Sequence, residues 1–301
     1  MIGLFAQSEL QEALGQGVAF EASMAKHTSL RIGGPADALA LPKDRAQLRT
    51  LLQICQRHAL PHTVIGAGFN VLVQEGGLSG VVINLKKLRR HEQVSESLVL
   101  AEAGVSHASL TRFCSERGLS GLEFAAGIPG TVGGWLRMNA GIPGREQKDV
   151  IREIEIVSAD GESEQTIPAE ELDFTYRDLK GLPEGALIVS GLFEVQPSTR
   201  EAVETEVRRL LERRSDSQPL DIPSCGSVFR NPKGDHAGRL IEAAGLSGER
   251  MGAAEISSVH ANFITNRGGA TATDVLGLID HIRERVLEES GIELETEVCI
   301  I

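Results

Sequence analysis

The sequence contains few aromatic residues and few cysteines. Aromatic side chains make up 4% of the 301 residues, with one tryptophan and one tyrosine. The four cysteines, Cys55, Cys114, Cys225 and Cys299, are far apart and form no CxxC motif. This spacing excludes a disulfide scaffold, and no His/Cys cluster has the spacing of zinc ligands. We therefore expect free thiols and no bound metal.

Long apolar runs and an excess of basic residues are also absent. Thirty Lys and Arg residues stand against 42 Asp and Glu residues, a net charge of −12, which argues against a general nucleic-acid binder. The apolar runs are far shorter than the roughly 20 residues of a membrane helix, and the acidic N-terminal segment does not resemble a signal peptide. We expect a cytoplasmic protein, a monomer, with neither nucleic acid nor membrane as a partner.

Glycine, by contrast, is concentrated in one apolar stretch, residues 120–141. It holds five glycines, namely Gly127, Gly130, Gly133, Gly134 and Gly141, and a hydroxyl donor at Thr131. Glycine permits positive φ angles and a close approach of the backbone to a ligand. Backbone amides in such a loop can bind phosphate. The stretch predicts a nucleotide or dinucleotide cofactor bound by backbone.

A second glycine-rich turn, Gly-Ala-Gly-Phe-Asn at residues 66–70, lies between two predicted strands. Taken alone, it is better interpreted as an ordinary hairpin turn. It lacks the GxGxxG fingerprint that opens a helix in Rossmann folds, and the chain has no GxxxxGK[ST] loop. Two glycine loops in adjacent blocks would nevertheless suit the two ends of a dinucleotide such as FAD.

The order of predicted elements is mixed α+β rather than a regular βαβ alternation. Capping residues and apolar periodicity predict helices at 44–59, 106–117, 236–244 and 271–289. Asp44, Ser106 and Thr271 or Thr273 are the expected N-caps. Alternation predicts a C-terminal strand at 293–300.

Three further segments carry candidate polar groups. Tyr176 and Arg177 could line an anionic pocket, although a surface arginine beside a half-buried ring is the simpler interpretation. Ser227 and Asn231 lie in the segment 226–232, which has no GxSxG elbow and so gives little support to a hydrolase. Three glutamates at alternate positions, 293, 295 and 297, would share one face of a strand, where solvation is the usual outcome.

Together these segments resemble the UDP-N-acetylenolpyruvoylglucosamine reductase family of flavoenzymes. The resemblance covers nearly the whole chain and rests on seven motifs in order, at residues 28–37, 66–70, 121–141, 176–177, 226–232, 260–263 and 295–298. Each motif is modestly specific, whereas all seven in this order are highly specific. The single tyrosine and the short middle block resemble the compact subtype, which lacks an inserted tyrosine-bearing loop.

The resemblance implies a fold and a cofactor. The expected fold is α+β, with a two-part FAD-binding module of the PCMH/vanillyl-alcohol-oxidase type in residues 1–90 and 91–196. A C-terminal α+β domain, residues 197–301, would bind the substrate. Non-covalent FAD would contact residues carried over from the family, namely Arg31, Gly66, Ala67, Gly68, Phe69, Asn70, Gly127, Gly130, Thr131, Gly133 and Gly134.

The resemblance also implies a reaction in peptidoglycan precursor synthesis. NADPH, as co-substrate, reduces the flavin, and a hydride then reaches the vinyl carbon of UDP-N-acetylglucosamine enolpyruvate to give UDP-N-acetylmuramate. Arg177 would stabilise the enolate, Ser227 would donate the proton, and Glu297, rather than Glu295, would assist at the same carbon. Tyr176 and Asn231 would contact the substrate.

Some residues depart from the family's pattern. Phe69 replaces a small hydroxyl residue, and Trp135 and Arg137 are unusual within the second glycine segment. Two alternatives remain open, and these departures motivate the second. One is another FAD oxidoreductase of the same fold that acts on a hydroxy acid or alcohol. The other is a non-catalytic nucleotide-binding protein, which would be colourless and would not bind added FAD.

Overall fold

The computed structural model describes residues 2–301 and divides them into two compact units. Of the described residues, the first unit comprises 2–21, Asp37–Ala67 and Ser79–Arg213, and the second comprises Ala22–Ala36, Gly68–Leu78 and Arg214–Ile301. The chain thus enters the second unit three times, and the helix α5 (Arg200–Ser217) runs across the last boundary. Within residues 2–301, no helix combines the length and apolarity needed to span a membrane.

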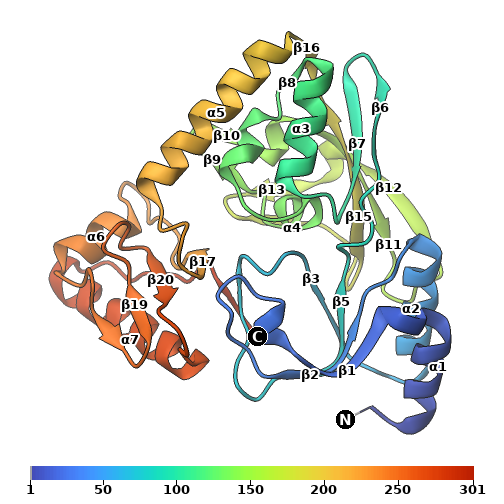
Figure 1. Ribbon diagram of the computed structural model, residues 1–301, viewed down its shortest axis with the longest axis horizontal. Coiled ribbons are helices and arrows are strands. Elements are labelled where there is room, and N and C mark those ends of the chain that lie inside the picture. The colour runs from blue at the N-terminus through green and yellow to red at the C-terminus, as the bar shows by residue number, and fades with distance from the viewer. Residues whose placement is uncertain (1) are drawn as a thin grey trace. The chain divides into compact units, whose positions relative to one another are not determined.

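The two largest sheets of the first unit have four and five strands (Figure 1). A four-stranded sheet has the order β1 (Val18–Ser23), β2 (Pro35–Ala40), β5 (Leu78–Asn84), β3 (His62–Ile65), and the ends of β1 and β2 continue into the second unit. A five-stranded antiparallel sheet has the order β12 (Glu164–Pro168), β11 (Ile151–Val157), β15 (Leu187–Glu194), β7 (Leu98–Glu102), β6 (His91–Ser95). Helices α1 (Leu4–Leu14) and α2 (Arg45–Arg57) pack on each other, and α3 (His107–Arg117) and the short α4 (Val132–Arg137) follow β7.

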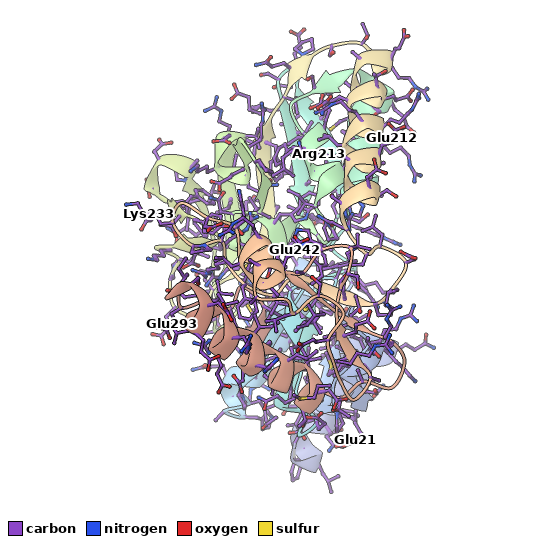
Figure 2. All side chains as sticks on the ribbon, turned by 90° about the vertical axis from the view of Figure 1, so that its left-hand side faces the viewer. Glu21, Glu212, Arg213, Lys233, Glu242 and Glu293 are labelled. Carbon is purple, nitrogen blue, oxygen red and sulfur yellow. The ribbon has the colours of Figure 1, made fainter. Side chains whose placement is uncertain are left out.

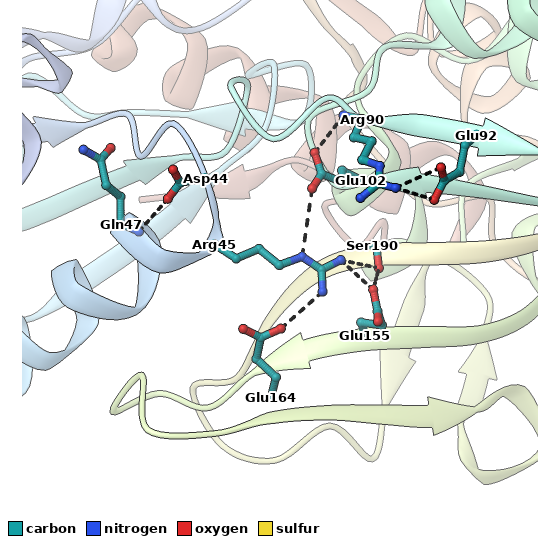
Figure 3. Close-up of polar contacts among 9 residues, drawn as sticks. All are labelled: Asp44, Arg45, Gln47, Arg90, Glu92, Glu102, Glu155, Glu164 and Ser190. Atoms are coloured by element: carbon teal, nitrogen blue, oxygen red, sulfur yellow. Dashed lines mark hydrogen bonds and ion pairs between the residues drawn. The ribbon is translucent and has the colours of Figure 1, made fainter.

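One arginine of α2 ties this helix to the five-stranded sheet (Figure 3). The Arg45 guanidinium lies 2.5 Å from Glu155 and 3.2 Å from Glu164, and it donates to Ser190 Oγ at 3.1 Å. Burial alone would raise the pKa of Glu155, but the hydrogen bonds from Arg45 and Ser190 outweigh burial and hold that pKa below its usual value. Helix α2 is therefore held to the five-stranded sheet by charge as well as by apolar packing in a shared hydrophobic cluster.

The second unit is built on a four-stranded antiparallel sheet with the order β17 (Ser224–Ser227), β20 (Phe263–Asn266), β19 (Ala254–Ile256), β18 (Arg250–Met251). Helices α6 (Ala237–Ala243) and α7 (Ala272–Ser290) pack with it around one hydrophobic cluster. The C-terminal strand β21 (Cys299–Ile300) pairs in parallel with β4 (Val71–Leu72), so the end of the chain lies beside the segment that follows residues 66–70.

The predicted helix starts are confirmed. The Asp44, Ser106 and Thr271 side chains accept hydrogen bonds from the backbone amides of Gln47, Ser109 and Asp274. Gly118 ends α3 with a φ of 61°, as its position predicts. Local capping chemistry therefore determines these boundaries.

The predicted strand at 293–300 is wrong for most of its length. Only Cys299–Ile300 forms a strand, and Thr296 makes one isolated bridge with Phe229. The segment has two successive partners, residues 228–230 and then residues 70–72, so no continuous ladder forms. Consequently the three glutamates do not share an environment. Glu293 and Glu295 are exposed, Glu293 at the end of α7 (Figure 2), whereas Glu297 is half-buried.

Candidate active site

A cavity of about 560 Å³ in the first unit is lined by both predicted glycine loops. Gly66 contributes from the first loop, and Thr131, Gly133 and Gly134 contribute from the second. The loops touch, because a Cβ added at Gly66 would lie 2.7 Å from Thr131 Oγ1. Ala67, Gly127 and Gly130 are not among the residues that line this cavity. Its volume lies within the usual range for cofactor sites.

The second glycine segment forms a helix, which the sequence did not predict. Thr131 precedes α4, and Gly133 and Gly134 form part of its first turn. The amides of Val132 and Gly133 donate to the carbonyls of Val105 and Ala103, at 3.0 and 2.9 Å. The fold therefore uses those two amides. Only the remaining backbone amides of the loop could bind a phosphate. The glycines instead provide space, because a Cβ at Gly134 would meet no protein atom within 4 Å.

Trp135 has a structural role in this segment. Its ring is 2% exposed, and its indole Nε1 donates to the Pro129 carbonyl at 3.3 Å. A Cβ at Gly130, whose φ is +126°, would lie 3.3 Å from the same nitrogen. Trp135 thus holds the loop at 129–131 against α4, which accounts for a residue that the sequence alone could not explain.

The remainder of the first glycine turn belongs to the second unit. The Gly68 carbonyl accepts from the Ser29 amide at 2.9 Å, and a Cβ at Gly68 would lie 2.2 Å from the His27 carbonyl oxygen. Asn70 Nδ2 donates to the Glu297 carbonyl at 3.1 Å. Phe69 is 37% exposed, and Arg31 has a φ of 57°. Asn70 therefore connects the cofactor-loop motif with the C-terminal glutamate.

Tyr176 and Arg177 form the two-residue tip of a hairpin between β13 (Asp173–Thr175) and β14 (Asp178–Lys180) in the first unit. Arg177 has a φ of +57°, a conformation that costs a residue with a Cβ about 1–2 kcal/mol. Its Nη1 donates to the Gly141 carbonyl at 3.3 Å, and its guanidinium carbon lies 5.2 Å from the centroid of the Tyr176 ring. Strain of this kind is concentrated at functional sites. The alternating residues 173–180 could have indicated this hairpin.

Ser227 and Glu297 are brought together in the second unit. Ser227 ends β17, and the Glu297 amide donates to the carbonyl of the next residue, Val228, at 2.7 Å. The Arg230 amide donates in turn to the Glu295 carbonyl at 2.9 Å. This short ladder aligns residues 227–230 with residues 295–298, so Ser227 and Glu297 come from adjacent backbone segments.

Buried Asn262 holds this ladder from the opposite side. Its Oδ1 accepts from the Phe229 amide at 2.9 Å, and its Nδ2 donates to the Phe229 carbonyl at 2.8 Å. Its own carbonyl accepts from the Val228 amide at 2.9 Å. The motif at 260–263 therefore fixes the backbone that carries Ser227.

Two residues that follow Ser227 differ in the hydrogen bonds that their side chains make. Asn231 Oδ1 accepts from the Ala237 amide at 3.0 Å, at the start of α6, so part of its side chain serves the fold. Arg230 is half-buried, and within residues 2–301 its Nε is a buried donor with no hydrogen-bond partner. An unpaired buried donor is costly, so its position favours an anionic ligand. The described residues contain no cluster of three or more metal-binding side chains.

Family comparisons agree with this arrangement. Residues 35–166 match an FAD binding domain, and residues 218–301 match the C-terminal domain of UDP-N-acetylenolpyruvoylglucosamine reductase. The reductase of Geotalea uraniireducens is 41% identical over 98% of this chain and 97% of its own. That of Geobacter metallireducens is 44% identical over 92% of each chain.

Solved structures give the same result. The crystal structure of the Thermus caldophilus UDP-N-acetylenolpyruvylglucosamine reductase superposes with a TM-score of 0.80 at 33% identity, covering 94% of this chain and 97% of that one. Phl p 4, a glucose dehydrogenase, shares the fold over 65% of this chain and 44% of its own, with a TM-score of 0.50 at 14% identity. The chain belongs to the UDP-N-acetylenolpyruvoylglucosamine reductase family.

Proposed function

We propose that this protein reduces UDP-N-acetylglucosamine enolpyruvate to UDP-N-acetylmuramate with NADPH, in peptidoglycan precursor synthesis. The reaction adds a hydride to the terminal vinyl carbon and a proton to the adjacent carbon, and NADPH becomes NADP⁺. FAD, when bound, supplies the relay of the hydride from NADPH to the substrate. The observation that carries the proposal is the ladder that places Glu297 beside Ser227, with the Glu297 amide 2.7 Å from the Val228 carbonyl.

The cavity of the first unit supports the assignment of the FAD site. Gly66, Thr131, Gly133 and Gly134 line it, and the side-chain space at Gly134 is open to a ligand rather than filled by protein. The first loop continues in the second unit with Gly68, Phe69 and Asn70. Arg31 lies in the segment Ala22–Ala36 of the same unit. We assign these residues, with Ala67, Gly127 and Gly130, to cofactor binding. Gly127 and Gly130 contribute by setting the conformation of their loop. The Asn70 side-chain amide, which donates to the Glu297 carbonyl, does the same for the first loop.

Each candidate catalytic residue has a chemical task. The Arg177 guanidinium stabilises the negative charge that develops on the substrate carboxylate after hydride addition. Ser227 donates the proton to the adjacent carbon, and Glu297, half-buried nearby, orients and resupplies that hydroxyl. The fixed backbone around Ser227 supports this assignment, because proton transfer requires a donor held at hydrogen-bond distance.

We assign candidate substrate contacts in each unit separately. Tyr176, which is 43% exposed at the hairpin tip, offers a ring and a hydroxyl to the sugar nucleotide. Asn231, which is exposed beside the start of α6, is assigned to the substrate as the family resemblance implies. The unpaired Arg230 Nε provides a positive group for an anionic part of the substrate.

We also propose an organisation and a location for this protein. As the family resemblance implies, three domains would comprise residues 1–90, 91–196 and 197–301, although one hydrophobic cluster crosses these bounds by joining Leu30 and Leu72 to C-terminal residues. Four free cysteines suit a reducing cytoplasm. We further propose that the protein is a monomer, and its charge of −12 opposes nucleic-acid binding.

The proposal is tested by anaerobic half-reactions on purified protein. A yellow protein should be bleached by NADPH and should regain its yellow flavin absorbance when the enolpyruvyl sugar nucleotide is added. Lactate serves as the matched control for a hydroxy-acid oxidoreductase. Bleaching by lactate without NADPH, or no recovery with the sugar nucleotide, would overturn the proposal.

A further inference from the structure

The hairpin that carries Arg177 is anchored by the end of α4. The Arg137 guanidinium donates to Asp178 Oδ1 at 2.5 Å and to the Leu179 carbonyl at 3.1 Å. Asp178 directly follows Arg177 and opens β14. The hydrogen bond from Arg137 outweighs burial and holds the pKa of Asp178 below its usual value, so the pair stays charged at neutral pH.

The other strand of the hairpin, β13, is held by Asn139, which lies just after the end of α4. Asn139 is fully buried, and its Nδ2 donates to the Thr175 carbonyl and to Glu146 Oε2, both at 3.0 Å. Its Oδ1 accepts from the Lys148 amide at 3.1 Å. Thr175 and Asp178 flank the hairpin tip, so the segment 137–139 contacts both strands immediately next to Tyr176 and Arg177.

The same helix also borders the cavity. Gly133 and Gly134, in its first turn, line the cavity, and so do Arg137 and Asp178 at its other end. Because α4 has only six residues, a cofactor that contacts its first turn lies within about 8 Å, along the helix axis, of the Arg137 backbone. The helix therefore connects the proposed cofactor site with the hairpin of Arg177.

We propose that Arg137 is a positioning residue for Arg177. Through Asp178 and the Leu179 carbonyl it fixes the strained hairpin tip relative to the cavity, and Asn139 fixes the opposite strand. The inference rests on the proposed role of Arg177 in the reduction. A guanidinium must be aligned with the developing carboxylate charge, and a misplacement of about 1 Å can lower a rate by about 100-fold. This role also gives the unusual arginine at 137 a function.

The test compares Arg137→Met with Arg152→Met. Both arginine side chains are 55% exposed and both pair with one carboxylate, Arg152 with Glu194 at a site outside the hairpin. With Arg137→Met, we expect faster hydrogen exchange in residues 173–180 of the holoenzyme and reoxidation of the reduced flavin by substrate about tenfold slower or more. Arg152→Met should change neither quantity, and Arg137→Lys should retain part of both because it keeps the ion pair.

A double substitution separates positioning from a general structural effect. In an Arg177→Met background, adding Arg137→Met should leave the reoxidation rate within about twofold, because the group that Arg137 positions is already absent. Exchange in residues 173–180 should still rise. Multiplicative losses in the double variant, or an Arg137→Met protein that matches Arg152→Met in both measurements, would overturn the inference. If Arg177→Met alone keeps the wild-type rate, the proposed role of Arg177 fails instead, while the exchange data still report whether Arg137 anchors the hairpin.

Discussion

A Cβ placed on Gly66 would lie 2.7 Å from the Oγ1 of Thr131. The two residues are 65 positions apart in the chain, yet they are in contact where both glycine loops line the cavity of the first unit. Thr131 is buried and β-branched, so it has little freedom to rotate away. The width of the cavity at this point depends on the absence of a side chain at residue 66.

Gly66→Ala should therefore weaken FAD binding. Overpacking of this kind costs about 1–3 kcal/mol, which corresponds to a roughly 5- to 150-fold rise in Kd if the cavity bears the strain. FAD titration of the apoprotein by fluorescence measures the effect. Gly76→Ala is the matched control, because a Cβ there meets nothing within 4 Å. Adding Thr131→Ala to Gly66→Ala should recover much of the affinity, and equal Kd values for Gly66→Ala and Gly76→Ala would contradict the contact.

Gly134→Ala separates a ligand clash from a protein clash. Gly134 lines the cavity in the first turn of α4, and a Cβ there meets no protein atom within 4 Å. The apoprotein should keep its stability or gain up to about 1 kcal/mol, because alanine favours a helix over glycine. FAD affinity should nevertheless fall, since the added methyl group occupies ligand space. Urea unfolding and FAD titration give the two quantities, and unchanged affinity would place the cofactor elsewhere.

Arg177→Gly should remove activity without loss of stability. Arg177 has a φ of +57°, and glycine adopts that conformation without the cost of about 1–2 kcal/mol that a side chain incurs. The lost hydrogen bond to the Gly141 carbonyl offsets part of this gain. The melting temperature of the variant should equal or exceed that of the wild type, while reduction of the substrate should be lost. A marked fall in melting temperature would show that Arg177 is retained for the fold.

His260 should make stability fall as pH falls below about 6.5, its unperturbed value. Burial lowers the pKa of His260, and its Nδ1 accepts from the Asn262 amide at 3.2 Å, so the folded state holds the neutral ring. Because the unfolded chain binds a proton that the folded chain resists, stability is fully present above the unfolded pKa and is lost as the pH drops toward the lowered folded pKa. Burial lowers the pKa of His62 in the same direction.

The His260 contribution is measured by urea unfolding at a series of pH values between about 5.5 and 7.5, one unit either side of that pKa. His260→Asn keeps an acceptor for the Asn262 amide and should reduce the slope of stability against pH. His236→Asn, which alters an exposed histidine of the same unit, should leave the slope unchanged. An identical slope in both variants would contradict the assignment.

The parts of the fold that the sequence predicted are those determined locally. Asp44, Ser106 and Thr271 cap their helices because a side chain and an amide three residues later suffice for the interaction. The C-terminal strand was predicted wrongly because its extent depends on partners at residues 70–72 and 228–230, more than 60 positions away. The α4 helix was missed because its glycines oppose helix formation. The burial of Trp135, and the hydrogen bonds from the first amides of α4 to the Val105 and Ala103 carbonyls, outweigh that preference.

For the candidate site, the sequence supplied the residue types and the family resemblance supplied their roles. Spacing alone could not distinguish Glu297 from Glu293 and Glu295, since three alternating glutamates are equivalent on a regular strand. The irregular backbone makes Glu297 half-buried and leaves the other two exposed. Arg137 stood out only as unusual in its segment, because its ion pair depends on a hairpin 41 residues later that brings Asp178 to it. The roles of Arg177, Ser227 and Glu297 remain predictions.

The most direct test of the account is the reoxidation of NADPH-reduced protein by UDP-N-acetylglucosamine enolpyruvate in a stopped-flow experiment, comparing Ser227→Ala with wild type. Ser224→Ala is the control, because Ser224 lies on the same strand and is likewise half-buried. We predict that Ser227→Ala slows reoxidation by at least about 100-fold, as expected for the loss of a general acid, and leaves reduction by NADPH nearly unchanged. Reoxidation at the wild-type rate in Ser227→Ala would contradict the account.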